Sequence, residues 1–316
     1  MAGKGVSARL ISQIWKAFKQ LNPGNVGREA GIAVKLGIIC SQSVVQDAAA
    51  YLLKDDMAAY DRAGDALLLI PEPSDPAAND LLQKCDIVLK WIGSPEAFPA
   101  IKQERIFEFA NGSDLEPVIM DILRAPYLKY AHLPLARAFP AFRPEVSVQV
   151  IQNVSVENAI FVISTSLGNV IPNPLQPLAS VAESVGDLAV LTANQFRMVF
   201  RLAAAYDKKL GYKEQMPELM TVLGAAFGWR SIARELVGMI PLGGGIVPKA
   251  AIAFAGTWAI GDAAAYYYRT GRKLTNEEIR QRFEAAMTKG RASAEDILGK
   301  MKQTYGEQVG RFIKKG

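Results

Sequence analysis

Histidine and cysteine are scarce in this chain, which has one histidine and two cysteines among its 316 residues. His132 has no second histidine or cysteine at ligand spacing, so neither a zinc site nor a Ser/His/Asp triad is supported. Cys40 and Cys85 lie in separate apolar runs, where free thiols behave as small buried hydrophobes. We therefore expect no metal, no disulfide framework and no histidine-dependent catalysis.

A signal peptide is not expected either, because no apolar core of the required length precedes a small-residue cleavage pattern. We therefore expect the protein to stay on the cytoplasmic side. The net charge of +5 is concentrated in residues 1–36 and 269–316. Basic ends attract anionic lipid or nucleic acid, although solvated helix faces explain them equally well. Nucleic acid is not an expected partner, because no aromatic and basic strand face accompanies the charge.

Residues 1–30 contain a predicted basic amphipathic helix. Leu10, Ile14 and Phe18 share one helical stripe, which Trp15 widens, while lysine and arginine lie elsewhere. Two interpretations stay open: Trp15 and Phe18 contact a membrane interface or a partner, or the stripe packs on the protein's own core. The segment NPGNVG predicts the end of this helix.

Residues 31–126 alternate between strand-like and helix-like segments. The apolar runs at 32–40, 65–73, 86–93 and 105–110 predict strands, and helices are expected around 47–53, 77–84 and 114–123. Short apolar strands separated by helices are typical of a small parallel sheet covered by helices. Ligands of such sheets bind beyond the carboxyl ends of the strands.

The first carboxyl end lies in GIICSQSVVQDAAAYLL, residues 37–53, which has the layout of a nucleotide phosphate loop. A working loop reads G-x-x-x-x-G-K-S/T, because its backbone must wrap the phosphates while its lysine and hydroxyl reach phosphate and magnesium. In that frame Cys40, Val45, Gln46 and Asp47 stand at the diagnostic positions, and none has the required chemistry. We therefore expect these four residues to be vestigial and no cofactor to bind there.

The later segments resemble small GTPase domains. DALLLIPEPSDPAANDLLQKCDIVLKWIG is similar to their fourth and fifth strands, and FEFANGSDLEPVIMDIL to their closing strand, Ser-Ala loop and final helix. The guanine-reading Asn-Lys-x-Asp motif is missing, and the link before residue 65 is too short for switch loops. The resemblance implies a shortened, degenerate GTPase-like domain over 31–126, with an unrelated small α/β domain as the alternative.

Residues 127–145 contain Pro134, Pro140 and Pro144, so we predict a connector in which long helices do not persist. Two charge-poor stretches follow it. The first, 158–182, contains Phe161 and Ile163 and is broken by prolines before it reaches the roughly 20 residues of a spanning helix. It is therefore expected to be too short to cross a membrane as one helix.

The second stretch lies between Glu235 and Asp262 and forms an expected apolar hairpin. Ala251, Ala255 and Ala259 recur at spacing four beside Gly256, which lets helices approach closely. An aromatic and basic end resembles a membrane-interface belt; its members are Trp258, Tyr266, Tyr267, Tyr268 and Arg269. Asp262 argues against insertion, because a buried carboxylate is costly in lipid, and a tightly packed soluble hairpin remains open.

The helical region is similar to the YcjF-like domain of unknown function (domain of unknown function 697). The resemblance rests on Leu191-Thr192-Ala193-Asn194-Gln195-Phe196-Arg197-Met198, on Gly228-Trp229-Arg230 and on Ala255-Gly256-Thr257, and it covers roughly 130–270. That family is bacterial, occurs alone or behind GTPase domains, is described as membrane-associated and has no established catalytic residues. We expect Asn194, Gln195, Arg197 and Gly256 to have structural roles.

Residues 271–316 predict basic helices. Thr275 and Glu278 form a capping box for a helix through about Lys289, and Ser293 can cap another. The apolar stripe of the second helix suits the protein's own core, a partner helix or lipid.

These features predict an α-rich chain: an α/β domain over 31–126, then an all-α domain over 146–270 with basic helices after it. The leading hypothesis is a non-catalytic protein, peripheral or monotopic on the cytoplasmic face of the inner membrane. Its expected partners are anionic lipid and an unidentified protein, either a GTPase or a second copy. The alternatives are a nucleotide-binding protein with an atypical site and a soluble oligomeric scaffold.

Overall fold

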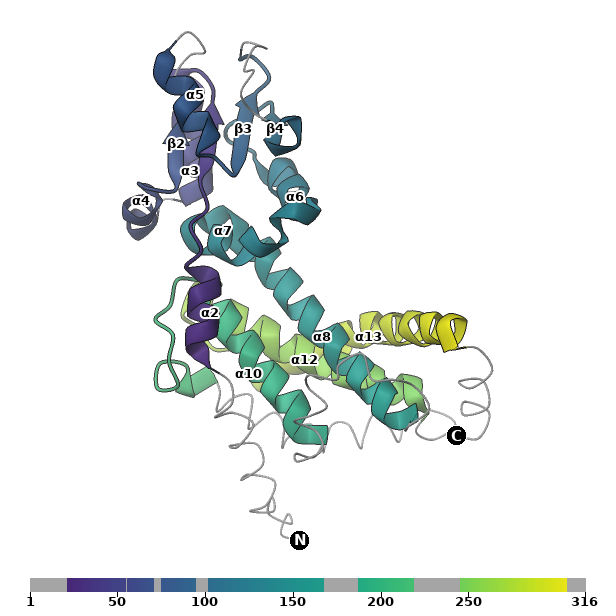
Figure 1. Ribbon diagram of the computed structural model, residues 1–316. Coiled ribbons are helices and arrows are strands. Elements are labelled where there is room, and N and C mark those ends of the chain that lie inside the picture. Colours follow the sequence, from purple (N-terminus) through teal and green to yellow (C-terminus); the bar gives the residue numbers. More distant parts are fainter. Residues whose placement is uncertain are drawn as a thin grey trace. The chain divides into compact units, whose positions relative to one another are not determined.

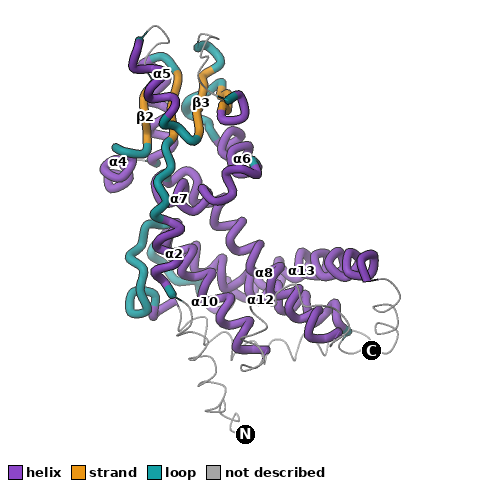
Figure 2. The backbone as a smooth tube through the Cα atoms, in the orientation of Figure 1, coloured by secondary structure: helices purple, strands orange, loops and turns teal. Residues whose placement is uncertain are grey.

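The computed structural model describes residues 22–54, 56–70, 75–94, 102–167, 187–218 and 245–305. The chain divides into two compact units. One contains Asn25–Ser147 and Ala204–Lys209, and the other contains the described residues of Val148–Ala203 and of the chain from Leu210 onward. The first unit carries a parallel sheet with helices, and the second is helical (Figures 1 and 2). The expected combination of an α/β part and a helical part in an α-rich chain is therefore confirmed.

The sheet has four parallel strands in the order β2-β1-β3-β4. They are β1 (Leu36–Ile39), β2 (Leu67–Leu69), β3 (Ile87–Trp91) and β4 (Ile106–Phe109). Each strand lies within one of the predicted apolar runs. Strand β1 is central, because Leu36 pairs with both Leu67 and Ile87, and all four of its residues are buried. A central strand buried on both faces must be apolar throughout, which explains its unbroken run.

The helices around the sheet follow from its strand order. They are α2 (Pro23–Ala30), α3 (Gln42–Leu53), α4 (Met57–Ala63), α5 (Pro76–Gln83), α6 (Glu116–Arg124) and α7 (His132–Ala138), with short 3-10 turns η1 (Gln103–Arg105), η2 (Pro126–Ala131) and η3 (Pro140–Phe142). Helix α3 joins β1 to β2, and α5 joins β2 to β3. Because β2 and β3 flank β1 on opposite sides, right-handed crossovers place α3 and α5 on opposite faces of the sheet.

Two of these helices differ from the sequence-based expectation. The segment NPGNVG begins α2, because Pro23 occupies the first helical position and Asn22 Oδ1 accepts the Gly24 N–H at 2.9 Å. The helix that this segment was predicted to end lies outside the described residues. Helix α4 fills the short link before β2, and Asp56 caps it by accepting the Ala59 N–H. Capping residues therefore start helices in two segments where the spacing of apolar residues alone does not predict a helix.

The proline-rich segment 127–145 contains the short helices η2, α7 and η3, followed by the first residues of α8. Pro134, Pro140 and Pro144 each lie in the first turn of a helix, where the missing N–H has no intrahelical partner to lose. Helix α8 (Arg143–Leu167) begins inside this segment and is 25 residues long. The first charge-poor stretch, 158–182, was predicted to be too short to cross a membrane as one helix. That prediction did not include the residues before Asn158 that belong to the same helix.

The helical unit contains α8, α10 (Asp187–Ala205), α12 (Ile246–Thr270) and α13 (Asn276–Tyr305). Helices α12 and α13 form an antiparallel hairpin, because Asp262 pairs with Arg282 and Gly290 lies against Ala251 (Figure 1). A shared core joins this hairpin to α8; its buried members are Ala159, Ile163, Leu167, Ala250, Phe254, Ala294, Leu298 and Met301. The described parts of both charge-poor stretches, 158–167 and 245–262, thus place much of their apolar surface inside the protein.

Helix α13 is continuous where two helices were expected. The capping box is present, since Thr275 N donates to Glu278 Oε2 at 2.8 Å and Glu278 N donates to Thr275 Oγ1 at 3.2 Å. The helix then runs through Gly290, where a Cβ would lie 2.8 Å from the Ala251 carbonyl oxygen. Glycine at this position permits close packing of the two helices instead of ending one of them.

One described segment, Pro140–Leu167, is long and apolar enough to cross a membrane by length and composition. More than half of its most apolar window is buried inside the protein, as in the core helix of a soluble bundle.

Candidate functional site

The carboxyl edge of the sheet between β1 and β3 is the place where sheets of this order bind ligands. Only Cys40 and Ser41 separate β1 from α3. The helix is formed from its first turn, because Val44 N and Val45 N both donate to Ser41 O, at 3.0 and 3.1 Å. A turn of two residues has no segment that could wrap a phosphate.

The four positions of the phosphate-loop frame are accordingly not gathered in one loop. Cys40 lies half-buried in the turn, whereas Val45, Gln46 and Asp47 lie on α3 itself. Gln46 and Asp47 are exposed, and Val45 is half-buried. Their backbone belongs to a regular helix, so the positive φ that a phosphate loop takes from glycine is not required here.

The neighbouring loops lie close to this turn. Ser94 Oγ, after β3, donates to Ile39 O at 3.2 Å. In the loop after β4, a Cβ on Gly112 would lie 2.9 Å from Val44 O and 3.1 Å from Ala48 N, so this loop contacts α3 directly. These contacts involve hydroxyl and backbone groups without a lysine, and the described residues contain no cluster of metal ligands. At this edge, the loops after β3 and β4 therefore pack against the end of β1 and against α3.

The two thiols of this unit are poor nucleophiles. Burial raises the pKa of Cys40 to about 11, and burial reinforced by the Asp86 charge raises the pKa of Cys85 to about 11. A thiol with so high a pKa is almost entirely protonated at neutral pH. Cys85 instead fills the space above Gly37, whose added Cβ would lie 2.7 Å from its sulfur.

The motif residues Asn194 and Gln195 enter a buried network across α8, α10 and α12. Asn194 Nδ2 donates to Asn158 Oδ1 at 2.8 Å, and Asn158 Nδ2 donates to Thr257 Oγ1 at 2.8 Å. Gln195 Nε2 also donates to Thr257 Oγ1 at 3.2 Å, and that hydroxyl donates to Ala253 O. We call these four side chains, none more than 9% exposed, the amide–hydroxyl network. It contributes helix-to-helix hydrogen bonds and leaves no amide pointing to solvent.

The other two motif residues lie outside the network. Arg197 forms an ion pair with Glu157 of α8. Gly256 is buried, yet no described residue lies within 4 Å of the position that its Cβ would take. The close approach occurs instead at Gly261, where a Cβ would lie 2.7 Å from Ile151 Cγ1 and 2.8 Å from Met198 Sδ. The sequence motif identified small residues on α12 but not the one at the crossing point.

The aromatic residues that suggested lipid contact lie largely in the protein interior. Phe161 and Ile163 are fully buried. Trp258 stacks on Phe254 with ring centroids 5.7 Å apart, and the Lys289 ammonium lies 4.6 Å from its ring. Trp15 and Phe18 lie outside the described residues.

The tyrosine and arginine end of α12 builds the corner between α12 and α13. Arg272 donates to the Tyr266 hydroxyl and to Glu278, and Gly271 ends α12 with φ 71°. Tyr268 is 8% exposed, Tyr267 and Tyr266 are half-buried, and the Arg269 guanidinium lies 5.7 Å from the Tyr266 ring. Arginine groups that resembled a membrane flank therefore also have protein partners.

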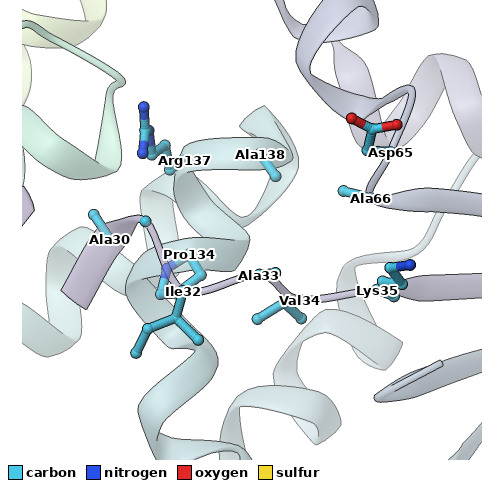
Figure 3. A pocket seen from close by; sticks show the side chains of 11 residues that line it. Ala30, Ile32, Ala33, Val34, Lys35, Asp65, Ala66, Pro134, Arg137 and Ala138 are labelled. Carbon is cyan, nitrogen blue, oxygen red and sulfur yellow. The ribbon is translucent and has the colours of Figure 1, made fainter. Parts of the chain in front are cut away.

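An open groove of about 320 Å³ lies at the amino ends of β1 and β2 (Figure 3). Its lining is mostly apolar, with Lys35, Asp65 and Arg137 as the charged members. These three side chains point in different directions, and Arg137 Nε is 2.7 Å from Asp207 Oδ1 (Figure 3). The groove therefore does not gather reacting groups around one point.

Sequence reasoning missed Asn158 and Thr257 as network members. The available signal was a neutral polar residue inside each charge-poor stretch, which in a buried helix must find a hydrogen-bond partner. Comparison of the chain with protein-family models, curated proteins and solved structures gives no match.

Proposed function

We propose that this chain is a non-catalytic bacterial platform protein whose α/β unit binds a protein partner and whose helical unit associates peripherally with the cytoplasmic face of the inner membrane. The observation that carries the non-catalytic part is the two-residue turn between β1 and α3. Gln46 and Asp47 stand where a phosphate loop has its lysine and its metal-binding hydroxyl, so this turn lacks the groups with which such a loop holds nucleotide phosphates.

A degenerate GTPase-like origin of the α/β unit remains part of the proposal. It is supported by the parallel order β2-β1-β3-β4, with the strand-turn-helix at the central strand. The resemblance of the helical region to YcjF-like domains, which occur behind GTPase domains, supports the same interpretation. The partner proposed is a GTPase or a second copy of this chain.

Calorimetric titration with GTP and with ATP in the presence of magnesium tests the absence of nucleotide binding. We expect no heat of binding for the full chain. Binding that disappears in Gln46→Ala or Asp47→Ala would assign a nucleotide site to this edge and contradict the proposal. Val148→Ala, which changes an exposed residue of the helical unit, serves as the control variant.

Peripheral association is proposed in place of insertion because Asp262 is paired with Arg282 and the apolar faces of α8 and α12 pack in their own core. Flotation with phosphatidylglycerol vesicles tests it, with phosphatidylcholine vesicles as the control. The protein should float only with the anionic vesicles. Protein that stays at the bottom of both gradients would refute the membrane part.

A soluble oligomeric scaffold is the second candidate, and the tightly packed α12–α13 hairpin favours it. Sedimentation velocity without detergent distinguishes the two. A monodisperse oligomer that ignores anionic vesicles would support the scaffold and replace the membrane proposal.

A further inference from the structure

The amide–hydroxyl network has an unusual position for polar groups. Asn158 and Thr257 are 0% exposed, Asn194 is 2% exposed and Gln195 is 9% exposed, and they come from three different helices. Three side-chain hydrogen bonds between helices, at 2.8, 2.8 and 3.2 Å, connect them. Buried amides are costly to desolvate, and apolar residues of similar shape are often at least as stabilising. Stability alone therefore does not account for the network.

One face of α12 is lined by small residues. Ala251, Ala255 and Ala259 repeat at spacing four, close to one helical turn. This face packs on α13, because Ala251 lies against Gly290 and because Ala255 and Ala259 share a buried cluster with Phe283 and Ala286. The repeat therefore aligns α12 with α13 rather than with α8 and α10.

Two features on another face of α12 bear on its alignment with α8 and α10. Thr257 accepts the amide hydrogen bonds, and Gly261, four residues later, lies at the crossing with Ile151 of α8 and Met198 of α10. A shift by one turn would bring Thr257 or Ala265 into this crossing and would separate Thr257 from Asn158. The Asn158 and Gln195 amides would each lose a hydrogen bond while still buried, and this cost disfavours the shifted alignments.

We propose that the amide–hydroxyl network and the Gly261 crossing together form a register lock, which selects one axial alignment of α8, α10 and α12. This role goes beyond the proposed function and does not depend on it. It parallels the use of a single buried asparagine to choose the register of a coiled coil.

Distance measurement between spin labels tests the lock directly. Labels are placed on cysteines introduced at Asn153 of α8 and Lys249 of α12, both exposed, in a Cys40→Ser/Cys85→Ala background. The wild-type network should give one narrow distance distribution. The Asn158→Leu/Asn194→Leu variant removes both amides of one bond, while Thr257 keeps its bond to Ala253 O. We expect that variant to fold and to show a second population displaced by about one helical turn, roughly 5 Å.

Ser155→Ala is the matched control, because Ser155 is 0% exposed on the same helix and its hydroxyl has no hydrogen-bond partner among the described residues. It should keep the single distance. A folded double variant that also keeps a single narrow distance would overturn the proposal. If the leucine pair does not fold, Asn158→Ala/Asn194→Ala is measured instead; failure of both to fold would show a stabilising role and would equally overturn the lock.

Discussion

At the scale of single residues, two glycines of α12 have opposite surroundings. A Cβ on Gly261 would lie within 3 Å of side chains from α8 and α10, whereas a Cβ on Gly256 would meet no atom of the described part of the chain within 4 Å. The first position requires the absence of a side chain for packing. At the second position, glycine lowers helix stability through its larger loss of backbone entropy, and the described residues show no close contact that would require it.

Gly261→Ala should therefore lower the free energy of unfolding by about 1–3 kcal/mol, the usual effect of overpacking a core. Gly256→Ala should leave it unchanged or raise it by up to about 1 kcal/mol through helix propensity. Urea denaturation monitored by circular dichroism measures both. Equal destabilisation by the two substitutions would contradict the packing described at Gly261.

The thiols supply a second prediction at this scale. With pKa values near 11, about one in a thousand Cys40 or Cys85 side chains is a thiolate at pH 8. A thiol reagent such as DTNB should react slowly with both in the native protein and rapidly in urea. Cys40→Ala isolates Cys85, which is 1% exposed and should be the slower of the two. Fast native labelling of Cys85 would show that its surroundings open readily.

At the scale of elements, the hairpin of α12 and α13 explains the carboxylate that argued against membrane insertion. Asp262 Oδ2 is 2.8 Å from Arg282 Nη1, and both side chains are about one-third exposed. The pair links two helices across 20 residues of sequence.

A double-mutant cycle with Asp262→Asn and Arg282→Gln should give a favourable coupling energy of at most about 1 kcal/mol, because the pair is partly solvated. Thermal or urea unfolding of the four proteins measures it. The i,i+4 pair of Lys300 and Asp296 on α13 is the control and should couple more weakly, since it is more exposed. A coupling of zero at Asp262 would mean that the two charges do not interact in solution.

The start of α13 predicts a pH effect. The Thr275 backbone N–H and the Arg272 guanidinium lower the pKa of Glu278 from 4.5 to about 2. A carboxyl whose pKa is lower in the folded state stabilises that state above pH 4.5 and loses this contribution as pH falls toward 2.

Glu278→Gln should therefore destabilise the protein at pH 6 and have progressively less effect toward pH 2. Urea midpoints at several pH values between 2 and 6 measure the difference from wild type. Glu277→Gln at the neighbouring exposed position is the control. A difference that stays constant with pH would contradict the capping geometry.

At the scale of the whole molecule, the proposed attraction to anionic lipid depends on where the basic residues lie rather than on the net charge of +5. The described part of α13 pairs several of its charges internally, through Arg280–Glu284 and Lys300–Asp296. Arg269 and Lys273 lie before this helix, and more basic residues follow it in the sequence. The proposed attraction to anionic vesicles is therefore electrostatic rather than insertional.

Binding to phosphatidylglycerol vesicles should fall steeply as salt rises from about 0.05 to 0.5 M, because the screening length shortens over that range. Co-sedimentation at increasing sodium chloride concentration measures this. Arg269→Ala/Lys273→Ala should weaken binding at low salt, whereas Asn153→Ala should not. Binding that persists at 0.5 M salt would indicate apolar insertion instead.

Several features of the fold could be predicted from the sequence. Each of the four strands lies in a predicted apolar run, since a strand buried in a parallel sheet must be apolar along its length. The Thr275 and Glu278 capping box was equally predictable, because both groups act within four residues of chain. The unsuitability of Cys40, Val45, Gln46 and Asp47 for phosphate binding followed from side-chain chemistry alone.

Other features depended on contacts between distant residues. Gly290 breaks no helix because α12 packs against it, and the prolines of 127–145 begin helices because each falls in a first turn. Asn158 and Asn194, 36 residues apart, gain their roles only from each other. No local pattern can reveal such pairings.

The sequence by itself therefore determined local features of this protein: which segments form the buried strands and where the capping box of α13 forms. Only the tertiary structure decided how the small, apolar and polar residues of the helices are used. Whether an apolar stripe meets lipid or protein, and whether a buried amide is costly or paired, depends on the surface that lies opposite it. That surface comes from another part of the chain.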